Sequence, residues 1–98
     1  MAKYNVRVEK NALNELQKIY QSGQKSDIRK IDKIFKELSI HPREGIGKPE
    51  RLRYKNGEFC SRQVNKKDRM VYEIIEMQVV VIIYQVLGHY DDKRIYKF

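Results

Sequence analysis

The sequence contains few of the residues that build disulfides or metal centres. Among its 98 residues it has one cysteine and two histidines. The single thiol, Cys60, cannot form an internal disulfide. Together with His41 and His89 it makes too small a set for a thiolate or imidazole zinc site. We therefore expect a protein of the reducing cytoplasm that uses no metal and no other cofactor.

Long apolar runs are also missing. The longest run, Val79 to Tyr84, is far shorter than the roughly 20 residues that a membrane-spanning helix needs. Residues 1–14 contain no apolar core of signal-peptide length. We therefore expect no membrane partner, and a chain of 98 residues predicts one domain.

Acidic residues are clearly outnumbered by basic ones. The chain has 21 Lys and Arg against 13 Asp and Glu, for a net charge of +8. Such a charge favours polyanions, because phosphate contacts release bound counterions. RNA, DNA or an acidic protein are the partners that follow. A surplus of lysine can equally keep a small protein soluble, so the net charge alone does not show that the chain binds a polyanion.

The hydrophobic pattern predicts a strand followed by two antiparallel helices. Residues 4–8 alternate between apolar and polar, as in a half-buried strand. Apolar residues then recur at helical spacing between Asn11, a candidate N-cap, and Gly23, a candidate C-cap. A second amphipathic segment spans residues 26–40. Its other face is rich in lysine, which suits a solvated helix face or a track for phosphates.

Four strand-like runs complete the chain, with Asn56-Gly57 as the strongest turn signal between them. The runs are Leu52 to Lys55, Glu58 to Val64, Arg69 to Glu76 and Gln78 to Leu87. Before them, prolines and glycines in residues 41–49 predict a loop that delivers Glu50 to the start of a strand. We predict an α+β fold in which the helices cover one face of a mainly antiparallel sheet of about five strands.

A carboxylate, a guanidinium and an imidazole form a candidate catalytic set. Glu50 lies between two cations, which keep it ionised and able to accept a proton. Arg69 opens a strand and can hold charge that develops on a phosphate. His89, followed by Tyr90, can supply a proton near neutral pH. This set suits cleavage of RNA by its own 2'-hydroxyl without a metal.

Each of these residues also has an ordinary structural explanation. Glu50 can be an exposed side chain that pairs with its cationic neighbours. Arg62 and Arg69 can form ion pairs with Glu58, Asp68 or Glu73. A histidine at the end of a strand, such as His89, is often only a surface group. The residues alone leave both readings open.

Four short motifs resemble the YoeB/Txe branch of the RelE-type toxins in order and spacing. They are Glu44-Gly45-Ile46-Gly47-Lys48-Pro49-Glu50-Arg51-Leu52, Ser61-Arg62, Asp68-Arg69-Met70-Val71-Tyr72 and His89-Tyr90. The resemblance implies the small RelE-like ribonuclease fold over residues 1–90. Residues 91–98 would then be a C-terminal extension of unknown role.

The resemblance also implies an activity and its partners. Such a chain would be the toxin of a type II toxin-antitoxin pair, an endoribonuclease that cleaves mRNA in the ribosomal A site and inhibits translation. Its partners would be the ribosome, mRNA and an acidic antitoxin of the YefM or Phd kind, whose C-terminal segment orders on binding. Toxins of this branch also form homodimers.

The roles of individual residues follow from the same resemblance. Glu50 would be the general base, and Arg69 would stabilise the phosphorane-like state. His89 would be the general acid, and Tyr90 would help to place the nucleotide. The residues that would contact RNA are Lys48, Arg53, Arg62 and Gln63.

Two departures from the branch are visible. Gln63 stands where a second arginine is common, so we expect weaker support of the transition state, because an amide adds no charge. Eight residues follow the His-Tyr pair, which usually lies at or near the C-terminus. The first two of them, Asp91 and Asp92, should favour the protonated form of His89.

Two other functions remain open at this point. One is a ParE-like toxin that disables a topoisomerase by binding and cleaves nothing. The other is a basic RNA-binding module without catalysis, which the net charge and the strand aromatics permit. The ParE-like toxin would not need Glu50 or His89.

Overall fold

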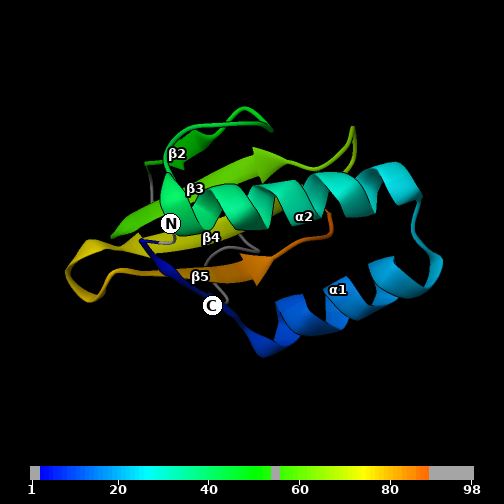
Figure 1. Ribbon diagram of the computed structural model, residues 1–98, viewed down its shortest axis with the longest axis horizontal. Helices are drawn as coiled ribbons and strands as arrows, with labels where there is room; N and C mark the ends of the chain where they lie inside the picture. Colours follow the sequence, from blue (N-terminus) through cyan, green and yellow to red (C-terminus); the bar gives the residue numbers. More distant parts are fainter. Residues whose placement is uncertain (1–2, 54–55, 89–98) are drawn as a thin grey trace.

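A computed structural model describes residues 3–53 and 56–88, which form one sheet with two helices against one of its faces (Figure 1). The elements are β1 (Asn5–Val8), α1 (Lys10–Ser22), α2 (Lys25–Ile40), β2 (Glu50–Leu52), β3 (Glu58–Gln63), β4 (Arg69–Ile75), the 3-10 helix η1 (Glu76–Gln78) and β5 (Val80–Gln85). The predicted α+β fold, with a strand, two helices and a mainly antiparallel five-stranded sheet, is confirmed.

The sheet has the strand order β1-β5-β4-β3-β2. Strands β2 to β5 form a meander of antiparallel pairs, whereas β1 pairs with β5 in parallel. A parallel pair requires a long crossover, and both helices lie within it. The last strand of the described residues, β5, is therefore an inner strand next to β1 and β4, and residues 86–88 follow it from inside the sheet.

The main core lies between the helices and the sheet. Its buried side chains include Leu16 and Ile19 from α1, Ile34 and Leu38 from α2, and Ile83 from β5. On the other face, Leu52, Phe59 and Val71 form a smaller cluster, against which Tyr84 packs. The Phe59 and Tyr84 rings stack with centroids 5.7 Å apart. The face without helices is therefore apolar only in part.

The predicted N-cap at Asn11 is wrong, because α1 already begins at Lys10. Glu9 occupies the cap position and makes no side-chain capping bond. Its backbone N–H instead donates to the carbonyl of Ile83 in β5 at 2.9 Å. The sheet therefore fixes where this helix starts, a tertiary contact that local sequence does not reveal. The C-cap at Gly23 is confirmed.

The ends of the strands differ from those predicted. The first run begins at Glu50 rather than Leu52, because residues 50–52 pair with residues 59–61. Its predicted end, Lys55, lies outside the described residues. The last run begins at Val80, because residues 76–78 form the 3-10 turn η1 and Val79 adopts a positive φ of 57°. Within the described residues, no helix combines the length and the apolar character that a bilayer crossing needs.

Candidate active site

The loop that leads into β2 depends on two glycines. Gly45 and Gly47 have φ angles of +130° and +83°, which side chains of L-residues rarely adopt. A Cβ on Gly45 would overlap the carboxylate of Glu37, and one on Gly47 would lie 2.9 Å from the carbonyl oxygen of Gln63. The loop can therefore pack directly against α2 and β3 only with glycine at both positions.

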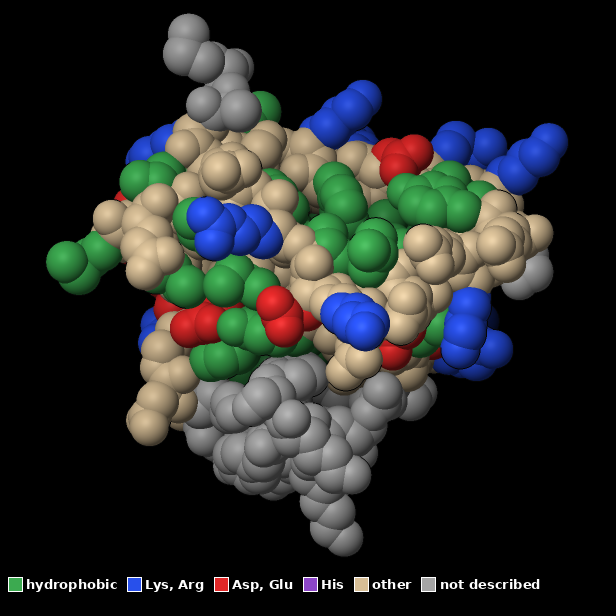
Figure 2. Space-filling view, turned by 90° about the horizontal axis from the view of Figure 1, so that it is seen from below, with side chains coloured by type: hydrophobic (Ala, Val, Ile, Leu, Met, Phe, Trp, Pro, Cys, Tyr) green, Lys and Arg blue, Asp and Glu red, His purple; other side chains and the backbone are tan. Residues whose placement is uncertain are grey.

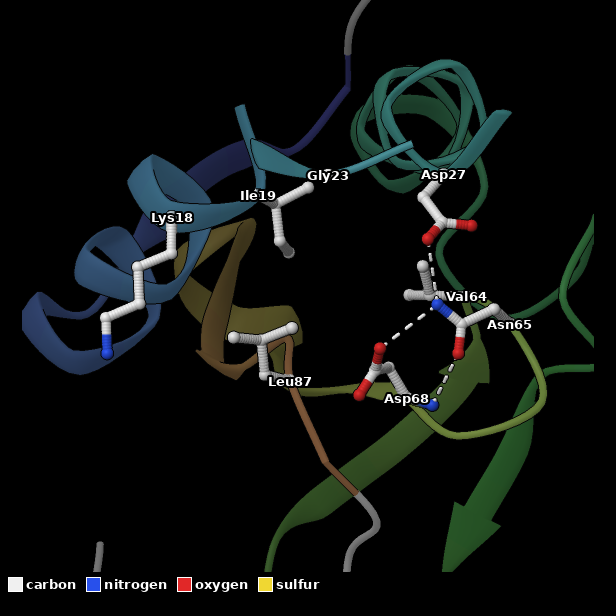
Figure 3. Close-up of a pocket in the computed structure, with 8 residues that line it drawn as sticks. All are labelled: Lys18, Ile19, Gly23, Asp27, Val64, Asn65, Asp68 and Leu87. Carbon is white, nitrogen blue, oxygen red and sulfur yellow. Dashed lines mark hydrogen bonds between the residues drawn. The ribbon is translucent and has the colours of Figure 1, made fainter. Parts of the chain in front are cut away.

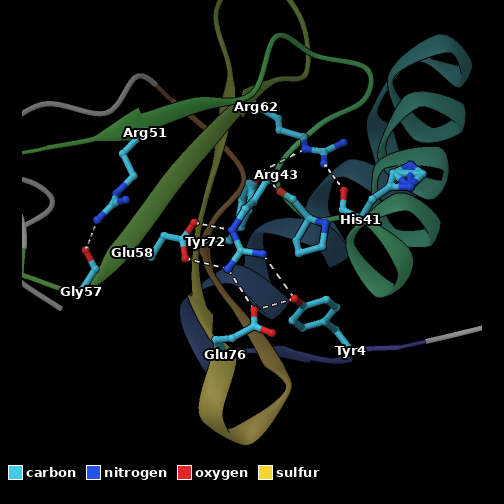
Figure 4. A network of polar contacts seen from close by, with 10 residues as sticks. Tyr4, His41, Arg43, Arg51, Gly57, Glu58, Arg62, Tyr72 and Glu76 are labelled. Carbon is cyan, nitrogen blue, oxygen red and sulfur yellow. Dashed lines mark hydrogen bonds and ion pairs between the residues drawn. The ribbon is translucent and has the colours of Figure 1, made fainter.

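The side chain of Arg62 packs under this loop and donates hydrogen bonds to its backbone (Figure 4). Its side chain is fully buried, with an exposed fraction of 0%. One terminal nitrogen, Nη1, lies 2.6 Å from Oε1 of Glu37, and the other, Nη2, donates to the carbonyl of Glu44 at 2.8 Å. Nη2 also donates to the carbonyl of His41, and Nε to the hydroxyl of Tyr72. All three guanidinium nitrogens are thus used inside the protein.

The prediction that Arg62 contacts an RNA phosphate is therefore wrong. The side chain has no exposed surface through which a phosphate could approach it. The sequence allowed Arg62 either to contact RNA or to form an ion pair with Glu58, Asp68 or Glu73. The structure shows an ion pair, but the partner is Glu37 in α2. Glu37 was not predicted, because a glutamate beside the apolar stripe of an amphipathic helix ordinarily faces solvent.

The Arg62–Glu37 pair also changes the acidity of its carboxyl group. Burial by itself would raise the pKa of Glu37, but hydrogen bonds from the backbone of Ile46 and from Arg62, with the charge of Arg62, bring that pKa below its ordinary value. Beside the pair, burial raises the pKa of Tyr72 to about 12, so its hydroxyl stays protonated and donates to the carbonyl of Pro42 at 2.8 Å. The loop is thus fixed from both α2 and β4.

We expect the folded state to weaken as Glu37 becomes protonated. Because the pKa of Glu37 is lowered on folding, its contribution to stability is fully present above 4.5, the ordinary value, and is lost as the pH falls through the lower folded value. The denaturant midpoint of Glu37→Gln should therefore fall less than that of the unmodified protein between neutral pH and about pH 3. Equal losses in both proteins would contradict this.

Two predicted catalytic side chains lie on the face of the sheet that the helices leave open. Glu50 stands directly opposite Ser61 in the β2–β3 pair, so both side chains project to the same face. Nε of Arg69 lies 3.2 Å from Oγ of Ser61. The carboxylate and the guanidinium therefore flank one buried serine. Gln63, opposite Arg69 in the β3–β4 pair, belongs to the same face.

The end of the described chain lies beside Arg69. The backbone N–H of Arg69 donates to the carbonyl of Gly88 at 3.0 Å, and the Gln85 side chain donates to the same oxygen at 3.3 Å. The predicted general acid, His89, and its neighbour Tyr90 lie outside the described residues, as does the extension 91–98. Their roles stay predictions. The last described residue nevertheless adjoins the guanidinium-bearing strand.

Two exposed cations lie close to Glu50 in the chain. Lys48 has a positive φ of 50° in the loop, and Arg53 follows the last residue of β2. Both side chains are exposed, so their contacts with RNA stay a prediction. In one view of the surface, Lys and Arg side chains are spread over the molecule with apolar and acidic surface between them (Figure 2). Among the described residues, no group of three His, Cys, Asp or Glu is arranged to hold a metal ion.

The one thiol of the chain is unsuited to nucleophilic chemistry. Cys60 is buried, and burial raises its pKa to about 11. A thiol of this kind is neutral at physiological pH, whereas the thiolate is the reactive form. Among the described residues, the groups that the site offers for chemistry are the carboxylate of Glu50, the guanidinium of Arg69, the hydroxyl of Ser61 and the amide of Gln63.

The fold of the chain is that of the small toxins of the YoeB and RelE kind. It matches the YoeB dimer from Staphylococcus aureus with a TM-score of 0.76 and 28% identity, over 91% of this chain and 100% of that one. It also matches the archaeal RelE–RelB complex from Pyrococcus horikoshii with a TM-score of 0.70 and 18% identity, over 88% of this chain and 94% of that one.

The sequence defines the family more closely. Residues 9–90 match the model of the YoeB-like toxins of bacterial type II toxin-antitoxin systems, and the chain belongs to this family. A Synechocystis protein named toxin YoeB is 32% identical over 63 residues, which are 64% of this chain and 73% of that protein. Toxin YoeB of Escherichia coli K12 is 31% identical over 62 residues, which are 63% of this chain and 74% of that protein.

Proposed function

We propose that this toxin is a ribosome-dependent endoribonuclease that cleaves mRNA in the A site and thereby inhibits translation. The observation that carries the proposal is the pairing of Glu50 and Arg69 around Ser61 on the open face of the sheet. Neither α1 nor α2 covers this face, and within residues 3–53 and 56–88 a strand of RNA can approach it (Figure 1). The net charge of +8 favours binding to ribosomal RNA.

The proposed reaction needs one base, one cation and one acid. Glu50 takes the proton of the 2'-hydroxyl, whose oxygen attacks the adjacent phosphorus. Arg69 stabilises the negative charge that builds up on the phosphate oxygens. His89 donates a proton to the 5'-oxygen as its bond to phosphorus breaks. The products are a 2',3'-cyclic phosphate and a 5'-hydroxyl, so the reaction balances without a metal or an oxidant.

We also propose partners for the chain. In Staphylococcus aureus, a similar YoeB chain is part of a heterotetrameric complex with YefM, and another structure is described as a YoeB dimer. By extension, this toxin binds an acidic antitoxin of the YefM or Phd kind and forms a homodimer. Its basic charge suits a partner whose acidic segment orders on binding.

The proposal is tested by mapping mRNA 5'-ends after brief induction, with ribosome positions recorded in parallel. We expect new ends at A-site codons for the unmodified toxin. Glu50→Gln should reduce them by about 10²-fold or more, because it keeps the shape of the side chain but removes the base. Glu44→Gln is the matched control, since it changes an exposed carboxylate of the preceding loop.

Each other outcome points to a different function. Growth arrest without new mRNA ends would favour a toxin that acts by binding, such as a ParE-like inhibitor of a topoisomerase. Tight ribosome binding without arrest or cleavage would favour a non-catalytic RNA-binding module. Equal cleavage by both glutamine variants and the unmodified toxin would remove Glu50 from the mechanism.

A further inference from the structure

Three consecutive backbone N–H groups after β5 are held by carboxylates from distant parts of the chain. Oε1 of Glu15, in α1, accepts hydrogen bonds from the N–H groups of Val86 at 2.7 Å and Leu87 at 3.0 Å. Oδ1 of Asp68, just before β4, accepts the N–H of Gly88 at 2.7 Å. Hydrogen bonds to an ionised acceptor are about twice as strong as neutral ones. We call this arrangement the carboxylate clamp.

The clamp acts just beyond the end of β5. Strand β5 ends at Gln85, and the backbone bond from the N–H of Arg69 to the carbonyl of Gly88 is a contact that still ties residues 86–88 to a neighbouring strand. Glu15 is 71 residues away from Val86 in sequence, and its side chain is half-buried. Such a carboxylate does more than keep the surface soluble, because it fixes α1 against the segment that leaves the sheet.

Asp68 is itself held in place from α2 (Figure 3). Its second oxygen, Oδ2, accepts from the side-chain amide of Asn65 at 3.0 Å, and the same amide nitrogen donates to Asp27 at 3.0 Å. Oδ1 of Asn65 in turn accepts the backbone N–H of Asp68 at 2.8 Å. These side chains and Leu87 line a hollow of about 180 Å³ between the helices and the β3–β4 turn.

The clamped segment is joined directly to the proposed site. The carbonyl of Gly88 accepts the backbone N–H of Arg69 at 3.0 Å, so Gly88 is bonded through both its N–H and its carbonyl. Asp68 directly precedes Arg69, and Gly88 directly precedes His89. Any displacement of residues 86–88 would therefore also move Arg69 at the start of β4 and Gly88, the residue that precedes His89.

We propose that Glu15 and Asp68 are positioning residues for RNA cleavage. They touch no reacting atom, and they fix the backbone of residues 86–88, whose Gly88 carbonyl accepts the backbone N–H of Arg69. The inference rests on the proposed ribonuclease function. It predicts that loss of the clamp slows the chemical step and leaves binding to the ribosome unchanged, because the exposed cations are untouched.

Glu15 provides the cleaner test, since Asp68 is adjacent to Arg69. Purified full-length variants are mixed with ribosomes programmed with a synthetic mRNA, and single-turnover cleavage is followed over a range of toxin concentrations. Glu15→Ala should lower the maximal rate by about tenfold or more, with the half-saturating concentration within about twofold of the unmodified value. Glu15→Gln should recover the rate to within about threefold, since its amide oxygen can accept both N–H groups.

A matched variant and a second measurement separate positioning from general stability. Glu9→Ala removes a carboxylate at the start of α1 that makes no capping bond, so it should cleave at the full rate. Amide hydrogen exchange at Val86 and Leu87 should accelerate in Glu15→Ala, and in Glu9→Ala it should stay unchanged. Thermal unfolding shows that each variant is folded at the assay temperature.

Two results would overturn the clamp and leave the proposed function intact. One is cleavage by Glu15→Ala at the rate of the unmodified toxin. The other is a loss confined to the half-saturating concentration, which would assign Glu15 to binding. If the unmodified toxin itself cleaves no programmed mRNA, the proposed function fails, and the positioning role fails with it.

Discussion

Replacing Arg62 with methionine should lower the free energy of unfolding by about 3–5 kcal/mol. The change leaves Glu37 as a charge without its cation, and it removes one hydrogen bond each from the carbonyls of His41 and Glu44. Removal of one partner from a buried ion pair is strongly destabilising, because the remaining charge, here on a Glu37 side chain that is 16% exposed, has little access to water. Stabilities of small domains are about 5–15 kcal/mol, so this loss is a large part of the total.

Arg43→Met is the matched control for the Arg62 prediction. Arg43 donates to Glu58 at 2.7 and 2.9 Å and to Glu76 at 2.9 Å, so it makes more bonds to carboxylates than Arg62, whose one carboxylate partner among the described residues is Glu37 (Figure 4). Its side chain is, however, 47% exposed, so water screens these pairs. We expect a loss of about 1 kcal/mol or less in urea denaturation of this variant.

The comparison of the two arginines tests whether burial decides the effect. Equal losses for Arg62→Met and Arg43→Met would show that the number of contacts matters and burial does not. Arg62→Lys should lie between them, since an ammonium group can meet Glu37 but cannot reproduce the planar fork that also reaches the loop carbonyls. Arg62 variants that stay folded should show faster amide hydrogen exchange at Ile46, whose N–H donates to Glu37, because the loop before Glu50 is then less well fixed.

The sequence was sufficient for most of the fold. Alternation near the N-terminus, two amphipathic segments and four strand-like runs each correspond to an observed element. What it did not provide was the long-range pairing. Nothing local indicates that β1 lies parallel to β5, or that the N–H of Glu9 reaches Ile83 and starts α1 before Asn11. Such contacts join residues more than seventy positions apart.

The same limit explains which site residues could be predicted. Glu50 and Arg69 were recognisable because their chemistry and spacing indicated catalysis, and the register places both beside Ser61. Arg62 looked equally suited to phosphate, since an arginine in a basic chain carries no local mark of burial. Only its position beneath the loop, opposite Glu37, shows that it is structural. Glu15 was not predicted, and Asp68 was considered only as an ion-pair partner and as part of a motif, because their role as acceptors depends on where residues 86–88 run.

Replacing Arg69 with alanine should lower the single-turnover rate of mRNA cleavage by about 10²- to 10³-fold. In the proposed reaction the guanidinium meets charge that exists only as the phosphorane-like state forms, so its loss reduces the rate more than the binding. Arg69→Lys should keep part of the rate, because it keeps the charge but loses the planar fork. Cleavage on programmed ribosomes at saturating toxin measures both variants.

Arg51→Ala provides the matched control for Arg69. Arg51 is an exposed arginine opposite Cys60, so it projects from the other face of the sheet than Glu50 and Ser61 do. Its loss should weaken ribosome binding and reduce the dependence of binding on salt, with little effect on the rate at saturation. Both arginine losses remove one positive charge from the chain. If Arg51→Ala slows saturated cleavage as much as Arg69→Ala does, the effect is one of total charge, and the assignment of Arg69 to the transition state is wrong.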